Sequence, residues 1–71
     1  KNYYLFVREA RRALDEKNWE SVKAPCLELI RLFPKQSGGQ SNAYAMLARA
    51  HRELKEFDEE RKTLETLASM S

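Results

Sequence analysis

The chain has 71 residues, enough for one small domain, and its formal net charge is +2. A chain of this length buries only about 60% of the surface that its unfolded state exposes, so it is marginally stable alone. Charged residues of both signs make up 34% of the sequence, and it contains only two Gly and two Pro. These values indicate a soluble helical protein rather than a disordered one, and the small net charge disfavours nucleic acid as a partner.

Cysteine content and hydropathy indicate which kinds of site and which cellular location the chain is expected to have. The single cysteine excludes an internal disulfide framework and a zinc site built from cysteines. No apolar run approaches the roughly 18 residues of a membrane span, so we expect no membrane contact, and no signal peptide is recognisable. These features slightly favour a cytoplasmic location. The chain begins with Lys1 rather than Met, which predicts a processed or trimmed piece of a longer protein.

The first half of the chain is expected to form two helices. An amphipathic stretch runs from about Asn2, a candidate N-cap, to about Glu16, and its first turns are apolar on every side. A second stretch begins at Asn18 as N-cap and keeps a 3.6-residue apolar stripe to about Phe33. Pro25 interrupts this stripe without changing its phase, so we expect one kinked helix. Two shorter helices that break before the proline are the alternative.

The second half repeats this arrangement after a loop. The loop, about 35–40, contains Gly38-Gly39, which we interpret as a flexible connector because no strand precedes the pair and no GK[ST] motif follows it. A helix over about 41–54, capped by its first serine, is expected next. A tight turn at Lys55-Glu56 then leads into a last helix over about 57–69.

An internal repeat relates the two halves. Shifting the sequence by 38 residues superimposes them with four identities and several similar pairs. The identities place Ala10-Arg11 on Ala48-Arg49, Lys17 on Lys55 and Leu29 on Leu67, and the similar pairs place Phe6 on Tyr44, Trp19 on Phe57 and Cys26 on Leu64.

This pattern resembles the tetratricopeptide repeat (TPR), a helix-turn-helix unit of about 34 residues. The first copy, about 3–36, fits the family pattern at Phe6, Ala10, Trp19, Leu29 and Pro34. The second copy, about 41–70, fits it at Tyr44, Leu47, Ala48, Phe57, Leu64 and Leu67. Four positions depart from it: Glu9 stands where Leu is usual, Val22 and Glu60 stand where a small Ala is usual, and Pro25 lies within the second helix of the first copy.

The resemblance implies an all-α fold over a single domain, 1–71. Two antiparallel helix hairpins, four helices in all, would stack as in a TPR-like α-α superhelix. Ala10 and Ala48 would let neighbouring helices approach closely, and Trp19 and Phe57 would fill equivalent wedges below the two turns. The alternative is an unrelated four-helix array with similar hairpins.

The ends of such an array are expected to need partners. Two repeats are fewer than the usual three, and the apolar start of the first helix has no evident mate within the chain. We therefore expect one or both ends to dock onto a second copy of the chain, as a homo-oligomer, or onto neighbouring repeats of a longer protein.

No catalytic, cofactor-binding or metal site is expected. His51 has no second histidine at ligand spacing, and Cys26 lies on the core stripe of its helix. Both are interpreted as packed core residues. The acidic run from Glu56 to Glu60 is interpreted as a solvated helix start, where negative charge complements the helix dipole.

The exposed side of the first helix of each repeat would line the concave groove that the resemblance implies. Seven residues are our candidates for this groove: Tyr4, Val7, Arg8, Arg11, Ala45, Arg49 and Arg52. A basic groove suits an acidic peptide or a C-terminal carboxylate, and ordinary solvated arginines are the alternative. The family's carboxylate clamp does not carry over, because its Lys and Asn places hold Val7, Arg11, Ala45 and Arg49.

The sequence therefore predicts a non-catalytic module for protein–protein interaction or scaffolding, with a protein or peptide partner. The alternative is a structural accessory piece of a longer protein, in which the repeats brace an enzyme domain.

Overall fold

The structure is a computed structural model that describes residues 3–33 and 43–69. These residues form four α-helices: α1 (Tyr3–Asp15), α2 (Trp19–Leu32), α4 (Ala43–Glu53) and α5 (Phe57–Ser69). The predicted all-α fold is confirmed, and each helix agrees with its expected range to within two residues at either end. The expected caps at Asn2 and Ser41, and the loop at 35–40, lie outside the described residues.

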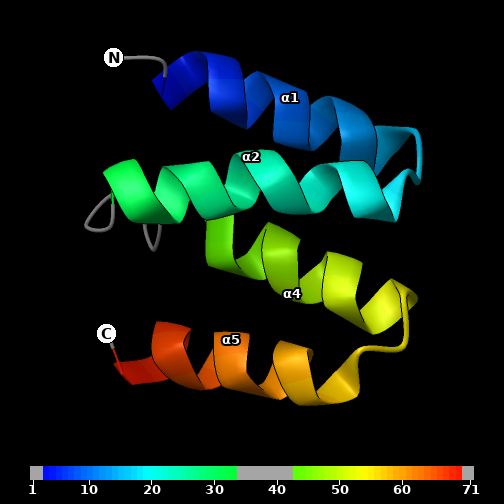
Figure 1. Cartoon of the computed structure of the whole chain (residues 1–71), viewed down its shortest axis with the longest axis vertical. Helices are drawn as coiled ribbons and strands as arrows, with labels where there is room; N and C mark the ends of the chain where they lie inside the picture. The colour runs from blue at the N-terminus through cyan, green and yellow to red at the C-terminus, as the bar shows by residue number, and fades with distance from the viewer. Residues whose placement is uncertain (1–2, 34–42, 70–71) are drawn as a thin grey trace.

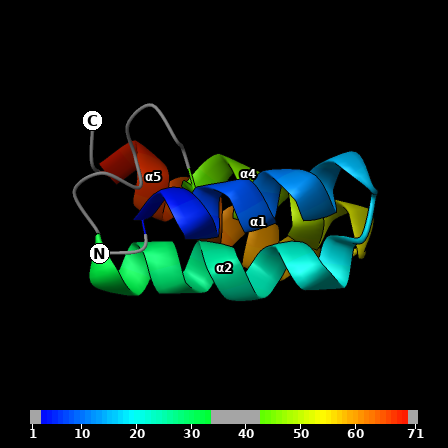
Figure 2. The same cartoon turned by 90° about the horizontal axis from the view of Figure 1, so that it is seen from above.

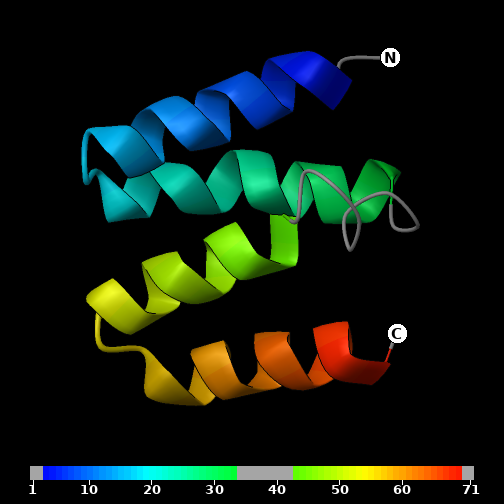
Figure 3. The same ribbon diagram turned by 180° about the vertical axis from the view of Figure 1, so that it is seen from behind.

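The helices lie side by side in chain order and alternate in direction (Figure 1). α1 packs against α2, α2 against α4, and α4 against α5, so two antiparallel hairpins stack through the contact between α2 and α4. The same succession is seen from behind in Figure 3, and Figure 2 shows α1 and α2 running alongside each other. The molecule measures 31 × 29 × 16 Å. None of the described helices is long and apolar enough to cross a membrane.

α2 continues through Pro25 as a single helix, so the alternative of two shorter helices is wrong. The proline is buried. Asn18 precedes α2, as expected, but its side chain makes no capping hydrogen bond. Its ψ of 78° lies outside the β region that N-cap residues usually adopt. The backbone amide of Ser21 donates instead to the carbonyl oxygen of Asn18 at 3.0 Å.

The two hairpin turns have the same backbone geometry. Lys17 and Lys55 both adopt positive φ, at 59° and 63°. After Lys17, the amide of Asn18 donates to the carbonyl of Ala13 at 2.9 Å. After Lys55, the amide of Glu56 donates in the same way to the carbonyl of His51 at 2.8 Å. These are the hydrogen bonds of a Schellman motif, which ends a helix and turns the chain back.

The core lies along the contacts between α1, α2 and α4. Ala10 is fully buried and its repeat counterpart Ala48 is 3% exposed, which fits the expectation that small residues allow close helix approach. Nine buried residues from the three helices form one cluster: Ala10, Ala13, Val22, Cys26, Leu29, Ala43, Met46, Leu47 and Ala50. Burial of this apolar cluster supplies most of the driving force for folding.

The prediction that Trp19 and Phe57 fill equivalent wedges is wrong for Phe57. Trp19 is partly buried and packs against the core cluster, whereas Phe57 is 58% exposed. The difference arises because α4 packs on α2, while α5 has α4 on one side and no buried residue of its own. The stripe on α5 is apolar in sequence but remains uncovered in the structure.

The apolar start of α1 finds one partner among the described residues. Tyr3 contacts Phe33 edge to face, with 5.3 Å between the ring centroids, and Phe6 packs against the core cluster. Tyr4 and Leu5 lie on the other side of the helix, and they are 81% and 45% exposed. This outer side of α1 is therefore available to a ligand.

Candidate functional site

One open hollow, of about 540 Å³, lies along the outer side of α1. Its residues recur three or four positions apart, so they share one face of the helix. They comprise four of the seven predicted groove residues and three polar neighbours: Tyr4, Val7, Arg8, Arg11, Arg12, Asp15 and Glu16. We call this surface the α1 hollow.

The charge of the α1 hollow is divided along its length. Arg12 donates from Nε to Glu16 at 3.3 Å, close to the end of the helix. Within the described part of the chain, Arg8 and Arg11 have no carboxylate oxygen within 4 Å. The half of the hollow that begins at Tyr4 therefore carries uncompensated positive charge beside an exposed ring.

The other three predicted groove residues lie elsewhere. Ala45, Arg49 and Arg52 line a second hollow between α4 and α5, together with Ala48, Glu60 and Leu64. The structure therefore distributes the seven candidates over two hollows, four in one and three in the other.

The arginines of the second hollow are engaged within the fold. Arg52 Nε lies 3.1 Å from Glu60 Oε2, and this pair joins α4 to α5. The guanidinium of Arg49 lies 5.6 Å from the centroid of the Trp19 ring, a distance that permits a cation–π interaction. Arg49 Nε also lies 3.7 Å from Glu53. Arg52 therefore contacts a neighbouring helix and Arg49 lies over a ring of α2, although both side chains are more than half exposed.

A polar cluster that no sequence pattern predicted joins the two hairpins. Lys23 Nζ on α2 lies 3.3 Å from both carboxylate oxygens of Glu56, which precedes α5. Glu56 Oε1 also lies 2.7 Å from Nδ1 of His51, and Lys23 contacts Glu20 at 3.2 Å. Hydrogen bonding to His51, and then to Lys23, lowers the pKa of Glu56. The interpretation of the acidic run as a solvated helix start therefore holds for the exposed Asp58 and Glu59. It is wrong for Glu56, which joins this cluster, and for Glu60, whose side chain is 17% exposed and paired with Arg52.

The chemistry of this cluster is structural. Hydrogen bonding to Glu20, followed by Glu56, raises the pKa of Lys23. Lys23 and Glu56 are 33 residues apart and Lys23 is not on an apolar stripe, so no local pattern in the sequence signals their contact. Their ion pair connects α2 to the turn before α5, beside the buried contact between α2 and α4.

Cys26 and His51 are packed residues, as predicted. Cys26 is fully buried, and burial raises the pKa of its thiol to about 12, so a nucleophilic thiolate does not form near neutral pH. The His51 side chain is 12% exposed and bonded to Glu56. Over residues 3–33 and 43–69, no group of three or more His, Cys, Asp or Glu side chains is arranged to hold a metal ion.

Comparison of the chain with protein-family models, with curated proteins and with solved structures gave no significant match.

Proposed function

We propose that the chain is a non-catalytic, TPR-like module for protein–protein interaction, and that the α1 hollow binds an acidic peptide segment. The observation that carries this proposal is the pair Arg8 and Arg11, which lack a carboxylate partner among the described residues. Guanidinium groups form strong, often bidentate hydrogen bonds with carboxylates. The adjoining Tyr4 and Val7 supply apolar area for side chains between the acidic residues.

The charges at the other end of the hollow set the expected position of the peptide. Asp15 and Glu16 carry negative charge there, and the Glu16 carboxylate already forms an ion pair with Arg12. An acidic segment is therefore expected to lie over the part of α1 between Tyr4 and Arg11. A basic segment has no comparable site in this half.

A binding titration tests the proposal. The probe is a fluorescein-labelled peptide with eight Asp and Glu residues around one Leu, followed by fluorescence anisotropy. The double variant Arg8→Glu/Arg11→Glu is expected to weaken binding at least about tenfold, because it replaces two charge-assisted contacts with repulsion. The matched control Arg31→Glu/Lys62→Glu makes the same change of net charge away from α1, at exposed residues, and should bind nearly as the original chain.

Two outcomes would contradict the proposal. One is an equal loss of affinity in both double variants, which would mean that binding depends on the net charge of the chain and not on Arg8 and Arg11. The other is tighter binding of a single-stranded oligonucleotide of equal charge than of the peptide, which would favour a nucleic-acid partner.

A second candidate function is that of a structural brace against another domain. The observation that favours it is the exposure of Leu27 and Leu32 on α2, at 52% and 44%. In that case the acidic peptide would not bind, and the double substitution Leu27→Ser/Leu32→Ser would improve solubility without loss of stability.

A further inference from the structure

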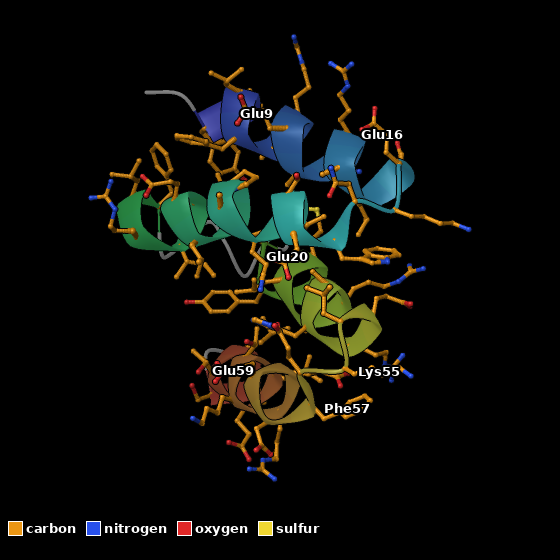
Figure 4. All side chains as sticks on the ribbon, turned by 45° about the vertical axis from the view of Figure 1, so that its right-hand side comes forward. Glu9, Glu16, Glu20, Lys55, Phe57 and Glu59 are labelled. Carbon is orange, nitrogen blue, oxygen red and sulfur yellow. The ribbon has the colours of Figure 1, made fainter. Side chains whose placement is uncertain are left out.

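The outer face of α5 carries an apolar stripe that no described helix covers. Phe57 and Leu64 are 58% and 42% exposed, and Ala68 continues the stripe one turn further. Figure 4 shows Phe57 on α5, at the opposite end of the array from Glu9 and Glu16 on α1. The stripe borders an open hollow, of about 420 Å³, lined by Phe57, Glu60, Arg61, Leu64, Glu65 and Ala68. We call this surface the α5 face.

The internal repeat indicates that this face is built to pack against a helix. Cys26 and Leu29 on α2 are fully buried, in one cluster with residues of α4. Their counterparts 38 residues later are Leu64 and Leu67 on α5. Two of the four buried residues of α2 therefore have apolar counterparts on α5, whereas Val22 and Pro25 correspond to Glu60 and Thr63. Leu64 lies on the uncovered side of the last helix of the array, and Leu67 is half-buried.

The charges beside the stripe indicate which helix fits. Glu60 is already paired with Arg52, and its side chain is only 17% exposed. Arg61 and Glu65, four residues apart, lie on the same side of α5 and carry opposite charges. Arg61 Nη2 also lies 3.5 Å from Asp58 Oδ1, but both side chains are exposed, so this pair is weak and Arg61 can exchange it for a carboxylate of a partner. They stand two residues before and two residues after Thr63. An antiparallel copy of this helix, centred on Thr63, would place Arg61 of each copy beside Glu65 of the other.

We propose that a second copy of this chain covers the α5 face, with the two α5 helices antiparallel about a two-fold axis at Thr63. The contact is isologous, so it closes as a dimer and does not propagate. The two Leu64 side chains meet near the centre. Each Phe57 ring faces the small Ala68 of the other copy, and the two Arg61–Glu65 pairs lie on one rim.

The expected dimer is weak. One helix pair buries less than the roughly 1,200–2,000 Å² of a stable standard interface. Because Arg61 and Glu65 lie on the rim, they contribute mainly to specificity through the cost of like charges. Protein concentrations from about 10 µM to about 1 mM are therefore the range in which dimerisation should be measured.

Sedimentation equilibrium with five chains tests the proposal. The original chain should dimerise, and Arg61→Glu and Glu65→Arg should each weaken the dimer at least about tenfold, because each sets like charges opposite each other. The double variant Arg61→Glu/Glu65→Arg restores opposite charges across the two-fold axis. It should dimerise within about threefold of the original chain. Lys62→Glu makes the same charge change one residue away, off the stripe, and should leave the dimer unchanged.

The results that would overturn the proposal are distinct. An original chain that stays monomeric at about 1 mM excludes the second copy as the occupant. If the single variants dimerise as well as the original chain, the interface does not include Arg61 and Glu65. If the double variant stays monomeric, the antiparallel pairing is excluded. Far-UV circular dichroism of each variant checks that it is folded. The α1 hollow is not involved, so peptide binding and dimerisation can fail independently.

Discussion

Lys17 and Lys55, which are 38 residues apart in the sequence, occupy the same place in two matching turns. Both have left-handed backbone conformations, with φ of 59° and 63°. The amide of each donates to a carbonyl three residues earlier at 3.0 Å, on Leu14 in the first turn and on Arg52 in the second. The two turns therefore match at the 38-residue spacing of the sequence repeat. A spacing one residue longer or shorter would not pair these two lysines.

The first prediction concerns these two lysines. A residue other than glycine pays a steric cost at positive φ, so Lys17→Gly and Lys55→Gly should each raise the free energy of unfolding by about 0.5–1 kcal/mol. Urea unfolding followed by circular dichroism measures this change. Lys62→Gly, inside α5, is the control and should lower the free energy by about 1 kcal/mol. If the turn variants are destabilised as much as the control, the assigned turn geometry is incorrect.

The second prediction uses the different surroundings of the two repeat-equivalent aromatic residues. Trp19 packs against the core and under Arg49, so Trp19→Ala should lower the free energy of unfolding by about 3 kcal/mol. Phe57 is 58% exposed, so Phe57→Ala should lower it by about 1 kcal/mol or less in the monomer. Thermal unfolding in dilute solution compares the two variants. Equal losses would mean that Phe57 is covered within the monomer.

The third prediction concerns the single cysteine. Because the Cys26 thiol is fully buried and its pKa is raised to about 12, a disulfide reagent should modify it only when the chain opens. Labelling at pH 8 should be slow in buffer and should accelerate through the urea unfolding transition. Rapid labelling of the folded chain, at the rate of a short cysteine peptide, would contradict the position of α2 in the core.

The fourth prediction is a pH dependence set by Glu56. Hydrogen bonds from His51 and Lys23 lower the pKa of this carboxyl in the folded chain, so the unfolded chain binds the proton more tightly. The stabilisation is present above about pH 4.5, the ordinary pKa of a glutamate, and is lost progressively at lower pH as the carboxyl becomes protonated in the folded chain. Thermal unfolding of Glu56→Gln should show a shallower loss of stability below this pH.

The control for this titration is Glu59→Gln, which removes a carboxyl whose only described contact is an exposed pair with Lys62 at 3.9 Å. It should follow the pH profile of the original chain. A profile of Glu56→Gln that also matches the original would show that the Lys23–Glu56–His51 cluster does not form in solution.

The helices were predictable because their apolar stripes and turn residues are local. The stripe from Val22 to Leu29 fixed the phase of α2 even through Pro25, and the buried Cys26 followed from that stripe. The exposure of Phe57 was not predictable, because an apolar stripe shows which face of a helix seeks a partner but not whether one is present.

The same limit explains why only part of the candidate site could be predicted from the sequence. The helix period correctly placed Arg8 and Arg11 together on the outer side of α1. It could not show that Arg49 lies over Trp19 or that Glu56 meets Lys23, because these contacts join residues 30 or 33 positions apart through the packing of α2 on α4. The structure thereby distinguishes Arg49 and Arg52, which have partners within the fold, from Arg8 and Arg11, which have no carboxylate oxygen within 4 Å among the described residues.

Amide chemical-shift mapping shows directly whether an acidic peptide binds at the α1 hollow. The ¹⁵N-labelled chain is titrated with the unlabelled Asp/Glu peptide and followed by two-dimensional NMR. We expect the largest shifts between Tyr4 and Arg11, with small changes in α4 and α5. Shifts centred on Arg49 and Arg52, or no localised shifts at saturating peptide, would contradict this expectation.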